Sequence, residues 1–356
     1  MLKKLIAFAL ALLMAASMAA CVGEEAPASN ADATQKPVPT SAPEADPTPG
    51  NEKKTYKIGF LMSGAINDSA WCAIAYAELQ NMKAAGHDTA YTENVEAAAI
   101  EENLRNYANE GYELIIGHGF EFGDPVLLIA DEYPDIYFFV TGKKPAADTV
   151  VPKNVCFVDS KYQEITYLIG MLAAGTSKTH CIGYIAGATN PTQIAGYNAF
   201  IEGAKYMDPN CDVKAVITGT FTDPAKGQET AIAQIEAGAD IIVQSASNTG
   251  LGAMEAAVGR GVYVIGNGSG QEKLYPDHVI ATYFINTQAI LANCISMMEN
   301  GQFGDQWRPG VKDNICQIPY INESLVPKET MDAFNKRKQE IIDGTFSVPE
   351  NLVYNP

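Results

Sequence analysis

The sequence predicts an α/β protein made of two doubly wound lobes, each built on a mainly parallel sheet. Short and almost continuously apolar runs alternate with segments of helical periodicity, which is typical of parallel strands covered by helices on both faces. The alternation occurs in two successive series, so two sheets are expected. The 356 residues are enough for two domains of ordinary size, and 47% hydrophobic with 19% charged residues is a globular balance.

The first series of expected strands starts at Tyr56 and forms the N-terminal lobe. Its strands are YKIGFLM at 56–62, ELIIGHG at 113–119, IYFFVTG at 136–142 and VCFVD at 155–159. A helical pattern over residues 69–85 follows the first strand. We expect this lobe to comprise residues 55–160 together with a returning segment at about 280–310.

The second series forms the C-terminal lobe, residues 161–279 with about 311–356. Its expected helices cover residues 191–207, 224–237 and 250–259. The chain is then expected to cross between the lobes near 160, 280 and 310. The strands of this series are CIGYIAG at 181–187, VKAVITG at 213–219, DIIVQSAS at 240–247, VYVIGNG at 262–268 and VIATYFI at 279–285.

Several strands of both series end in glycine or small polar residues. In open α/β sheets, ligands bind beyond the carboxyl ends of the strands, where helix N-termini point backbone N–H groups at them. The pattern therefore predicts a ligand-binding cleft between the lobes, without specifying the ligand. The strand ends concerned are at 63–64, 117–119, 187–189, 245–248 and 266–268.

The N-terminus predicts export and lipid attachment. Residues 1–20 form a signal peptide, with basic Lys3 and Lys4 before a short apolar stretch that ends in small residues. The segment before Cys21 resembles a bacterial lipobox, so Cys21 is expected to be acylated and to become the mature N-terminus; an ordinary signal peptide with a coincidental cysteine is the alternative. Residues 21–54, with six prolines and no aromatic residue, are expected to be a disordered linker that tethers the protein to the outer face of the cell membrane.

Charge and motif content exclude several function classes. With 42 acidic and 24 basic residues the formal charge is −18, so nucleic acid is not expected as a partner. The sequence has no P-loop, no HExxH and no GxSxG, and its four histidines are isolated. An enzyme is therefore not expected, nor is a cofactor. A dinucleotide site at 248–252 is disfavoured because Glu255 stands where the third glycine is needed.

Six cysteines remain after Cys21, and none of them has a close metal-ligand spacing. A zinc site is therefore not expected. Export permits disulfides, but buried free thiols are equally compatible with the sequence, and the pairing cannot be read. These cysteines are Cys72, Cys156, Cys181, Cys211, Cys294 and Cys316.

Four segments carry a family resemblance: IGFLMSGAINDSAW, GHGFEFGDPVLLIADEYPDIYF, KYQEITYLIGMLAA and GTFTDPAKGQETAIAQIEAGADIIVQSASNTGLGAMEAA. They resemble the basic membrane protein (BMP) family, the nucleoside-binding lipoproteins of ABC importers. The resemblance implies a type I periplasmic-binding fold with a three-segment hinge, capture of a purine nucleoside by lobe closure, an ABC permease as partner and no catalytic step. A ligand-sensing receptor for a membrane signalling partner is the alternative, and a nucleoside-cleaving enzyme is a third.

The resemblance also implies which residues bind the ligand. Trp71 takes the first-loop aromatic position that stacks on the base, and Phe221 takes the second, so that the two rings would sandwich a flat heterocycle. His118, at a strand end, could bond the ligand or brace its loop. The full set of expected ligand-binding residues is Asp68, Trp71, His118, Phe120, Glu121, Phe221, Asn248, Gly250 and Asn267.

The sequence departs from the family where the sugar is expected to bind. The family usually has I-G-V-D-x-D-Q after the strand, whereas residues 265–271 here read IGNGSGQ, with Gly268 and Gly270 at the two aspartate positions. A later family lysine is replaced within 282–286 by an uncharged residue, and Cys72 replaces the usual asparagine after the aromatic. A nucleobase or another flat heterocycle therefore competes with a nucleoside as the expected ligand.

Overall fold

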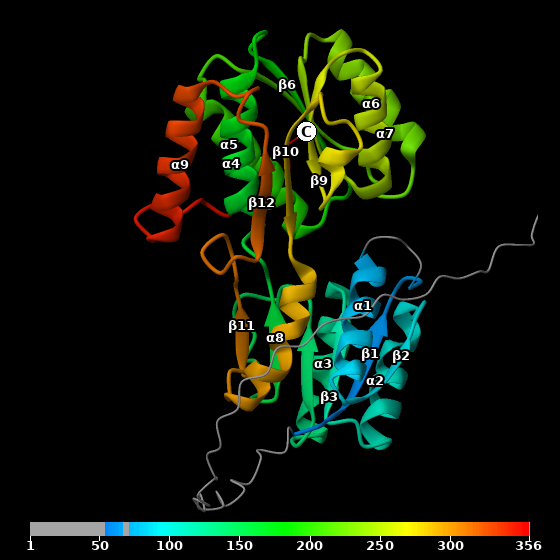
Figure 1. Ribbon diagram of the computed structural model, residues 1–356. Helices are drawn as coiled ribbons and strands as arrows, with labels where there is room; N and C mark the ends of the chain where they lie inside the picture. The colour runs from blue at the N-terminus through cyan, green and yellow to red at the C-terminus, as the bar shows by residue number, and fades with distance from the viewer. Residues whose placement is uncertain (1–53, 67–70, 356) are drawn as a thin grey trace, which may run out of the picture. The chain divides into compact units, whose positions relative to one another are not determined.

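The computed structural model describes residues 54–66 and 71–355 (Figure 1). The expected signal peptide, Cys21, the linker up to residue 53 and the candidate ligand residue Asp68 lie outside these ranges. Among the helices of the described ranges, none has the length and apolar character needed to span a bilayer.

The first lobe is a six-stranded parallel sheet with the order β11-β5-β4-β3-β1-β2. Helices α1 (Trp71–Ala84) and α8 (Thr287–Glu299) pack on one face, and α2 (Ile100–Asn109) and α3 (Gly123–Ile129) pack on the other. Apolar side chains of the strands point alternately to the two faces, which explains why the strands read as continuous apolar runs. The strands are β1 (Lys57–Met62), β2 (Asp88–Thr92), β3 (Leu114–His118), β4 (Tyr137–Val140), β5 (Val155–Val158) and β11 (Asp305–Trp307); short 3₁₀ turns are η1 (Ala97–Ala99), η2 (Phe120–Phe122) and η3 (Ala130–Glu132).

The second lobe has a sheet with the order β12-β10-β9-β8-β6-β7, in which only β12 runs antiparallel to its neighbour. Helices α4 (Tyr162–Thr176), α5 (Pro191–Met207) and α9 (Lys328–Ile342) cover one face, and α6 (Pro224–Glu236) and α7 (Ser247–Val258) cover the other (Figure 1). The strands are β6 (Cys181–Ala186), β7 (Asp212–Ile217), β8 (Ile241–Ser245), β9 (Tyr263–Asn267), β10 (Val279–Ile285) and β12 (Cys316–Ile321), and η4 is Gln271–Lys273.

Glycines allow the helices of the second lobe to pack closely. A Cβ at Gly203 of α5 would overlap the carbonyl oxygen of Tyr167 in α4, and a Cβ at Gly252 of α7 would overlap that of Pro224 in α6. Larger residues at these positions would push the helix pairs apart. The close packing fixes α5 against α4 and α7 against α6.

Within the described residues, the chain passes between the lobes three times, and the three segments are joined by backbone hydrogen bonds. Asp159 N–H donates to Trp307 O (3.0 Å), Lys161 N–H to Pro309 O (2.8 Å) and Asn286 N–H to Ile315 O (2.8 Å). The second passage differs from the expectation of about 280. Because the apolar run of β10 pairs with both β9 and β12, the chain stays in the second sheet as far as Ile285.

A cluster of charged side chains lies beside these segments. Asp159, 6% exposed, pairs with Arg308 (2.9 Å), and Glu350 near the C-terminus accepts from both Arg308 and Lys143 at 2.9 Å. Burial raises the pKa of Asp159, although Arg308 and Lys143 act to lower it. The cluster ties the C-terminal segment to β5 and to the third passage.

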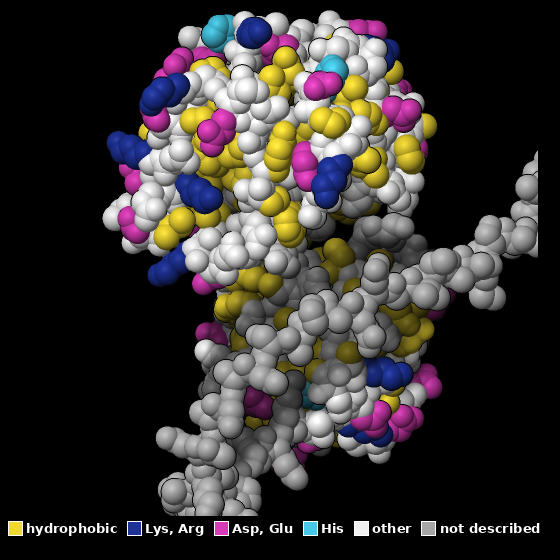
Figure 2. All heavy atoms as spheres, in the orientation of Figure 1, with side chains coloured by type: hydrophobic (Ala, Val, Ile, Leu, Met, Phe, Trp, Pro, Cys, Tyr) yellow, Lys and Arg dark blue, Asp and Glu magenta, His cyan; other side chains and the backbone are white. Residues whose placement is uncertain are grey.

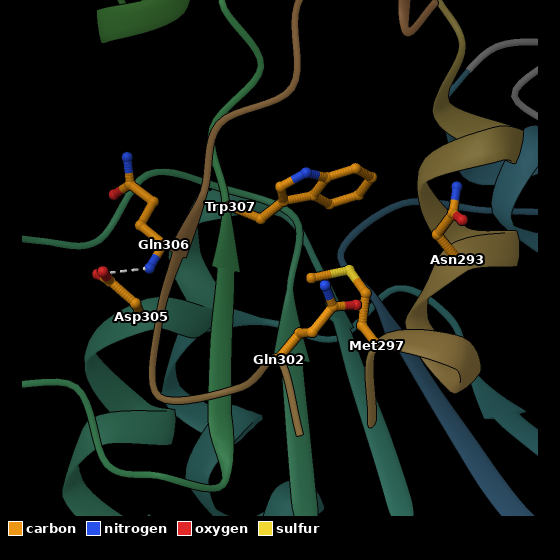
Figure 3. A pocket seen from close by; sticks show the side chains of 6 residues that line it. All are labelled: Asn293, Met297, Gln302, Asp305, Gln306 and Trp307. Atoms are coloured by element: carbon orange, nitrogen blue, oxygen red, sulfur yellow. Dashed lines mark hydrogen bonds between the residues drawn. The ribbon is translucent and has the colours of Figure 1, made fainter. Parts of the chain in front are cut away.

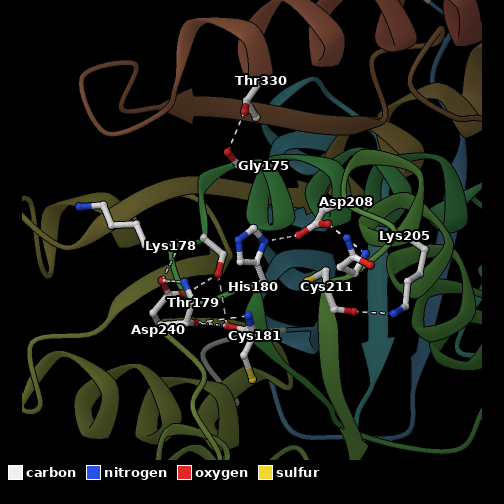
Figure 4. Close-up of polar contacts among 12 residues, drawn as sticks. Gly175, Lys178, Thr179, His180, Cys181, Lys205, Asp208, Cys211, Asp240 and Thr330 are labelled. Carbon is white, nitrogen blue, oxygen red and sulfur yellow. Dashed lines mark hydrogen bonds and ion pairs between the residues drawn. The ribbon is translucent and has the colours of Figure 1, made fainter.

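The opposite end of the second sheet is fixed by a second set of polar contacts (Figure 4). Asp240 accepts hydrogen bonds from the backbone N–H groups of Lys178 (2.7 Å) and Thr179 (3.0 Å), and the His180 ring contacts Asp208 at 2.6 Å. The hydrogen bond from His180 lowers the pKa of Asp208. These contacts close the loops that lead into β6 and β7, so we assign them a structural role.

The six cysteines left open by the sequence are all buried free thiols here. Burial raises the pKa of Cys156 and of Cys211 to about 12. Thiols with such pKa values are protonated at neutral pH and are therefore unreactive. Within the described ranges, no group of three or more His, Cys, Asp or Glu side chains could hold a metal ion.

Candidate functional site

Trp71 is the first residue of α1 and stands at the carboxyl end of the first sheet. Its side chain is 40% exposed, a large value for the biggest apolar residue. One face of the indole is covered by His118, with ring centroids 4.1 Å apart and the planes inclined by 17°. The indole is therefore supported on one face by His118, while part of its surface stays exposed.

His118 supports Trp71 and has no exposed surface of its own. Its Nε2 lies 3.1 Å from Trp71 O, and its Nδ1 lies 3.0 Å from Thr141 Oγ1. A carbonyl oxygen only accepts, so a neutral ring carries its proton on Nε2 and accepts from Thr141 through Nδ1. The packing of Trp71 and the two hydrogen bonds enclose His118 in this structure, and its contact with a ligand stays a prediction. The bracing role, the other possibility left open by the sequence, fits this geometry.

Phe120 and Glu121 follow β3 and lie in the short turn η2. Phe120 is 66% exposed, and its backbone fits against Gly142 at the end of β4, where a Cβ would lie 2.6 Å from Phe120 Cα. Gly119 has φ of +150°, and the carboxylate of Glu121 folds over it. The structure therefore places Trp71, Phe120 and Glu121 together at one edge of the first sheet.

Phe221 lies at the corresponding edge of the second sheet. Its ring packs directly on the backbone of Gly187 after β6, where any Cβ would overlap the ring. Glycine is needed there because it lets the ring lie flat on the strand end. Phe221 O also accepts from Thr249 N–H (3.2 Å), which joins its loop to α7.

Asn248 and Gly250 are in the first turn of α7, which begins at Ser247 rather than at the expected residue 250. Asn248 is exposed, but Gly250 is buried, and its N–H donates to Ala246 O (3.1 Å). A Cβ at Gly250 would overlap Gln244 Oε1. The absence of a side chain at Gly250 makes room for Gln244, and contact of Gly250 with a ligand stays a prediction.

Asn267, the last residue of β9, belongs to a polar network that the sequence did not predict. Its Nδ2 donates to the hydroxyl of Tyr162 (3.0 Å), which lies 2.6 Å from Ser245 Oγ. Ser245 Oγ donates to Gln193 Oε1 (3.2 Å). Burial raises the pKa of Tyr162 to about 12, so its hydroxyl is neutral at physiological pH. The sequence gave a signal for Asn267 and Ser245, which lie at predicted strand ends, but none for Tyr162 or Gln193.

The loop after β9 has no side chain at either aspartate position of the family. Gly268 has φ of +155°, and a Cβ there would lie 2.5 Å from Gln271 Nε2. The Gln271 amide donates to Asn267 O (3.1 Å) and accepts from Gln244 Nε2 (3.0 Å). The uncharged side chain of Gln271, hydrogen-bonded to Gln244, thus fills the space beside Gly268.

Two hollows lie elsewhere on the lobes. One, of about 350 Å³, is lined by Asn293, Met297, Gln302, Asp305, Gln306 and Trp307 (Figure 3). The other, of about 300 Å³, is lined by Asn248 together with Pro224, Leu251, Gly252, Glu255, Leu274 and Tyr275. Neither contains Trp71 or Phe221. On the face seen in Figure 2, basic and acidic side chains are interspersed over the second lobe, so this face offers no continuous positive surface.

Residues 55–352 match the family model described as ABC transporter substrate-binding protein PnrA-like. The chain belongs to this family. Its members are substrate-binding proteins rather than enzymes, and the predicted type I periplasmic-binding fold is confirmed. A solute-binding protein of an ABC transporter system from Aeropyrum pernix superposes with a TM-score of 0.72 at 20% identity, covering 83% of this chain and 94% of that one.

Two curated relatives carry ligand names. A purine-binding protein of Brucella abortus is 32% identical over 226 residues, which span 62% of this chain and 62% of that protein. The nucleoside-binding protein BmpA of an ABC transporter in Lactococcus lactis is 26% identical over 306 residues, 80% of this chain and 85% of that protein.

Proposed function

We propose that this chain is a lipid-anchored substrate-binding protein that captures a purine base or nucleoside outside the cytoplasm and delivers it to an ABC permease. The observation that carries the proposal is the pair of supported aromatic rings, Trp71 on His118 and Phe221 on Gly187. Each ring stands at the strand ends of its own lobe and is covered on one side by its own lobe. When the lobes close, a flat heterocycle can stack on both.

The polar groups around the two rings suit a neutral ligand. The second lobe presents the partly exposed amides of Asn267 and Gln193 near its strand ends, and the buried, neutral hydroxyls of Ser245 and Tyr162 lie behind them. Hydrogen bonds from such groups orient a heterocycle without requiring it to carry charge. The names of the Brucella and Lactococcus relatives support a purine as that heterocycle.

The sugar is expected to contribute little to affinity. With glycine at positions 268 and 270 there is no carboxylate to hold ribose hydroxyls, and the Gln271 amide fills the space beside Gly268. A free base should then bind within about tenfold of its nucleoside. Takeover of the sugar contacts by Asn267, Ser269 or His118 is the competing possibility, although His118 is buried in this structure.

A thermal-shift screen of adenine, guanine, hypoxanthine, their nucleosides and free ribose tests the proposal. A ligand that binds only the folded state at 100 times its Kd adds about 2.7 kcal/mol to stability, which raises Tm by about 5 °C for a chain of this size. We expect this shift with at least one purine and none with ribose. A screen in which ribose alone stabilises the protein, or in which no purine does, contradicts the proposal.

A further inference from the structure

Four side chains at the strand ends of the second lobe form one continuous line of hydrogen bonds, here called the amide relay: Asn267, Tyr162, Ser245 and Gln193. Asn267 ends β9, Ser245 ends β8, Tyr162 begins α4, and Gln193 lies in the first turn of α5. The successive bonds measure 3.0, 2.6 and 3.2 Å.

The direction of every bond in the amide relay follows from the two terminal amides as the structure places them, because each hydroxyl has one proton to donate. Gln193 Oε1 can only accept, so Ser245 uses its single hydroxyl proton on that bond. The Tyr162 hydroxyl must then donate to Ser245, which leaves its oxygen to accept from Asn267 Nδ2. Each hydroxyl thus has its one proton committed.

This direction couples the two terminal amides, because reversing one of them alone breaks the line of bonds. A rotated Asn267 amide would place Oδ1 against the Tyr162 oxygen, so two acceptors would face each other without a proton between them. Tyr162 and Ser245 are 3% and 2% exposed, and water cannot readily relieve that clash. With the two amides as the structure places them, Asn267 Oδ1 and Gln193 Nε2 lie on the side away from the relay.

The two ends of the amide relay are its accessible parts. Asn267 and Gln193 are partly exposed, in contrast to the two residues between them. Within the described residues, neither Asn267 Oδ1 nor Gln193 Nε2 makes a hydrogen bond. Asn267 Oδ1 is thus left as an acceptor and Gln193 Nε2 as a donor, at the carboxyl ends of the strands of the second sheet, where Phe221 also lies.

We propose that the amide relay determines specificity in the second lobe by presenting Asn267 Oδ1 as an acceptor and Gln193 Nε2 as a donor to a neutral ligand. The inference rests on the proposed function of the cleft. The ligand must supply a donor and an acceptor of its own, as the N–H and C=O edge of an oxopurine or the hydroxyls of a ribose do. Tyr162 and Ser245 act as positioning residues, since they hold the amides without touching the ligand.

Calorimetric titration of the wild-type protein and matched variants tests the inference. Tyr162→Phe and Ser245→Ala interrupt the relay, whereas Tyr197→Phe removes the hydroxyl of another buried tyrosine of the same lobe, one that donates only to Ala215 O (3.3 Å). The probes are hypoxanthine, unsubstituted purine, which lacks the oxo edge, and inosine.

If the relay reads the base, the wild-type protein favours hypoxanthine over purine by about tenfold or more, and both relay variants reduce this ratio to about threefold or less. If it reads the sugar, both variants weaken inosine by a similar factor and leave hypoxanthine unchanged. Tyr197→Phe leaves every ratio as in the wild type. If neither Tyr162→Phe nor Ser245→Ala changes the relative affinities for hypoxanthine, purine and inosine, the inference is overturned.

Failure of the relay inference can be distinguished from failure of the proposed purine-binding function. If the wild-type protein binds none of the three probes, the purine proposal is refuted. Urea unfolding of the ligand-free protein then tests whether the residues of the amide relay are energetically coupled. We expect Tyr162→Phe and Gln193→Ala to be non-additive by about threefold or more in the unfolding equilibrium constant, because the relay couples them. Additive effects overturn the inference whatever the ligand.

Discussion

Replacing Trp71 by alanine should weaken ligand binding by an amount that the structure allows us to work out. A tryptophan side chain offers up to about 250 Å², so an exposed fraction of 40% leaves about 100 Å² open. A planar ligand that stacks on the indole would cover about half of it. At about 25 cal/mol per Å² this burial contributes about 1.3 kcal/mol, and the stacking geometry adds about 0.5–1.5 kcal/mol. The Kd should therefore rise about 20- to 100-fold in Trp71→Ala.

Calorimetric titration with the best-binding purine measures the effect. Leu128→Ala is the matched control, because Leu128 is an apolar residue of α3 in the same lobe that is 68% exposed. It should change Kd less than twofold, as expected for a surface truncation outside the site. A change below about threefold in a folded Trp71→Ala variant would refute the stacking argument.

Fluorescence gives a second readout of the same residue. The sequence has two tryptophans, Trp71 and Trp307, and Trp307 lies at the edge of the first sheet in β11. Quenching on addition of ligand should disappear in Trp71→Phe. Quenching that persists there would place the ligand near Trp307, beside the hollow of Figure 3.

Four further outcomes are expected. Titration of hypoxanthine and inosine should give Kd values within about tenfold of each other. A nucleoside that binds more than about a hundredfold tighter than its base would refute the inference that the sugar contributes little to affinity when glycine occupies positions 268 and 270. Gly268→Asp should lower the free energy of unfolding by about 1–3 kcal/mol in urea titrations, since the position has φ of +155° and abuts Gln271, and unchanged stability would contradict that strain. The ordinary tyrosine pKa is 10.0 and that of folded Tyr162 is about 12, so the folded state holds its proton more tightly and the stability that this provides, present below pH 10, is lost as pH rises through 12. Wild-type protein should therefore lose stability more steeply than Tyr162→Phe over this range, and equal slopes would count against a buried, neutral Tyr162. Finally, Cys21→Ser should move the protein from the membrane fraction to the soluble fraction, and a variant that stays processed and membrane-bound would exclude lipidation at this residue.

Much of the fold could be predicted because its central strands are buried on both faces. The run VIATYFI was predicted at 279–285 and is β10, and the helix predicted over 191–207 is α5. Three of the four edge strands within the described residues escaped prediction for the same physical reason, whereas the edge strand β7 was predicted from VKAVITG at 213–219. The strands β2, β11 and β12 are half-exposed, so they lack the continuous apolar pattern, and β11 has only three residues.

The site was less predictable because its geometry depends on contacts between distant segments. Resemblance identified Trp71 as a stacking residue, but nothing in the sequence shows that His118, 47 residues away, lies behind it. Gly250 was predicted as a ligand-binding residue, and the sequence gives no sign that it lies against the Gln244 side chain. The Tyr162 hydroxyl reaches Ser245 across 83 residues of chain, which no local pattern encodes.

A crystal structure of the protein with the purine that raises its Tm most would test the central claim most directly. Our account predicts that the ring lies between Trp71 and Phe221, with its polar edge or its sugar within hydrogen-bond distance of Asn267 Oδ1 and Gln193 Nε2. A purine found outside the two aromatic rings, for example in the hollow beside Trp307, would contradict it.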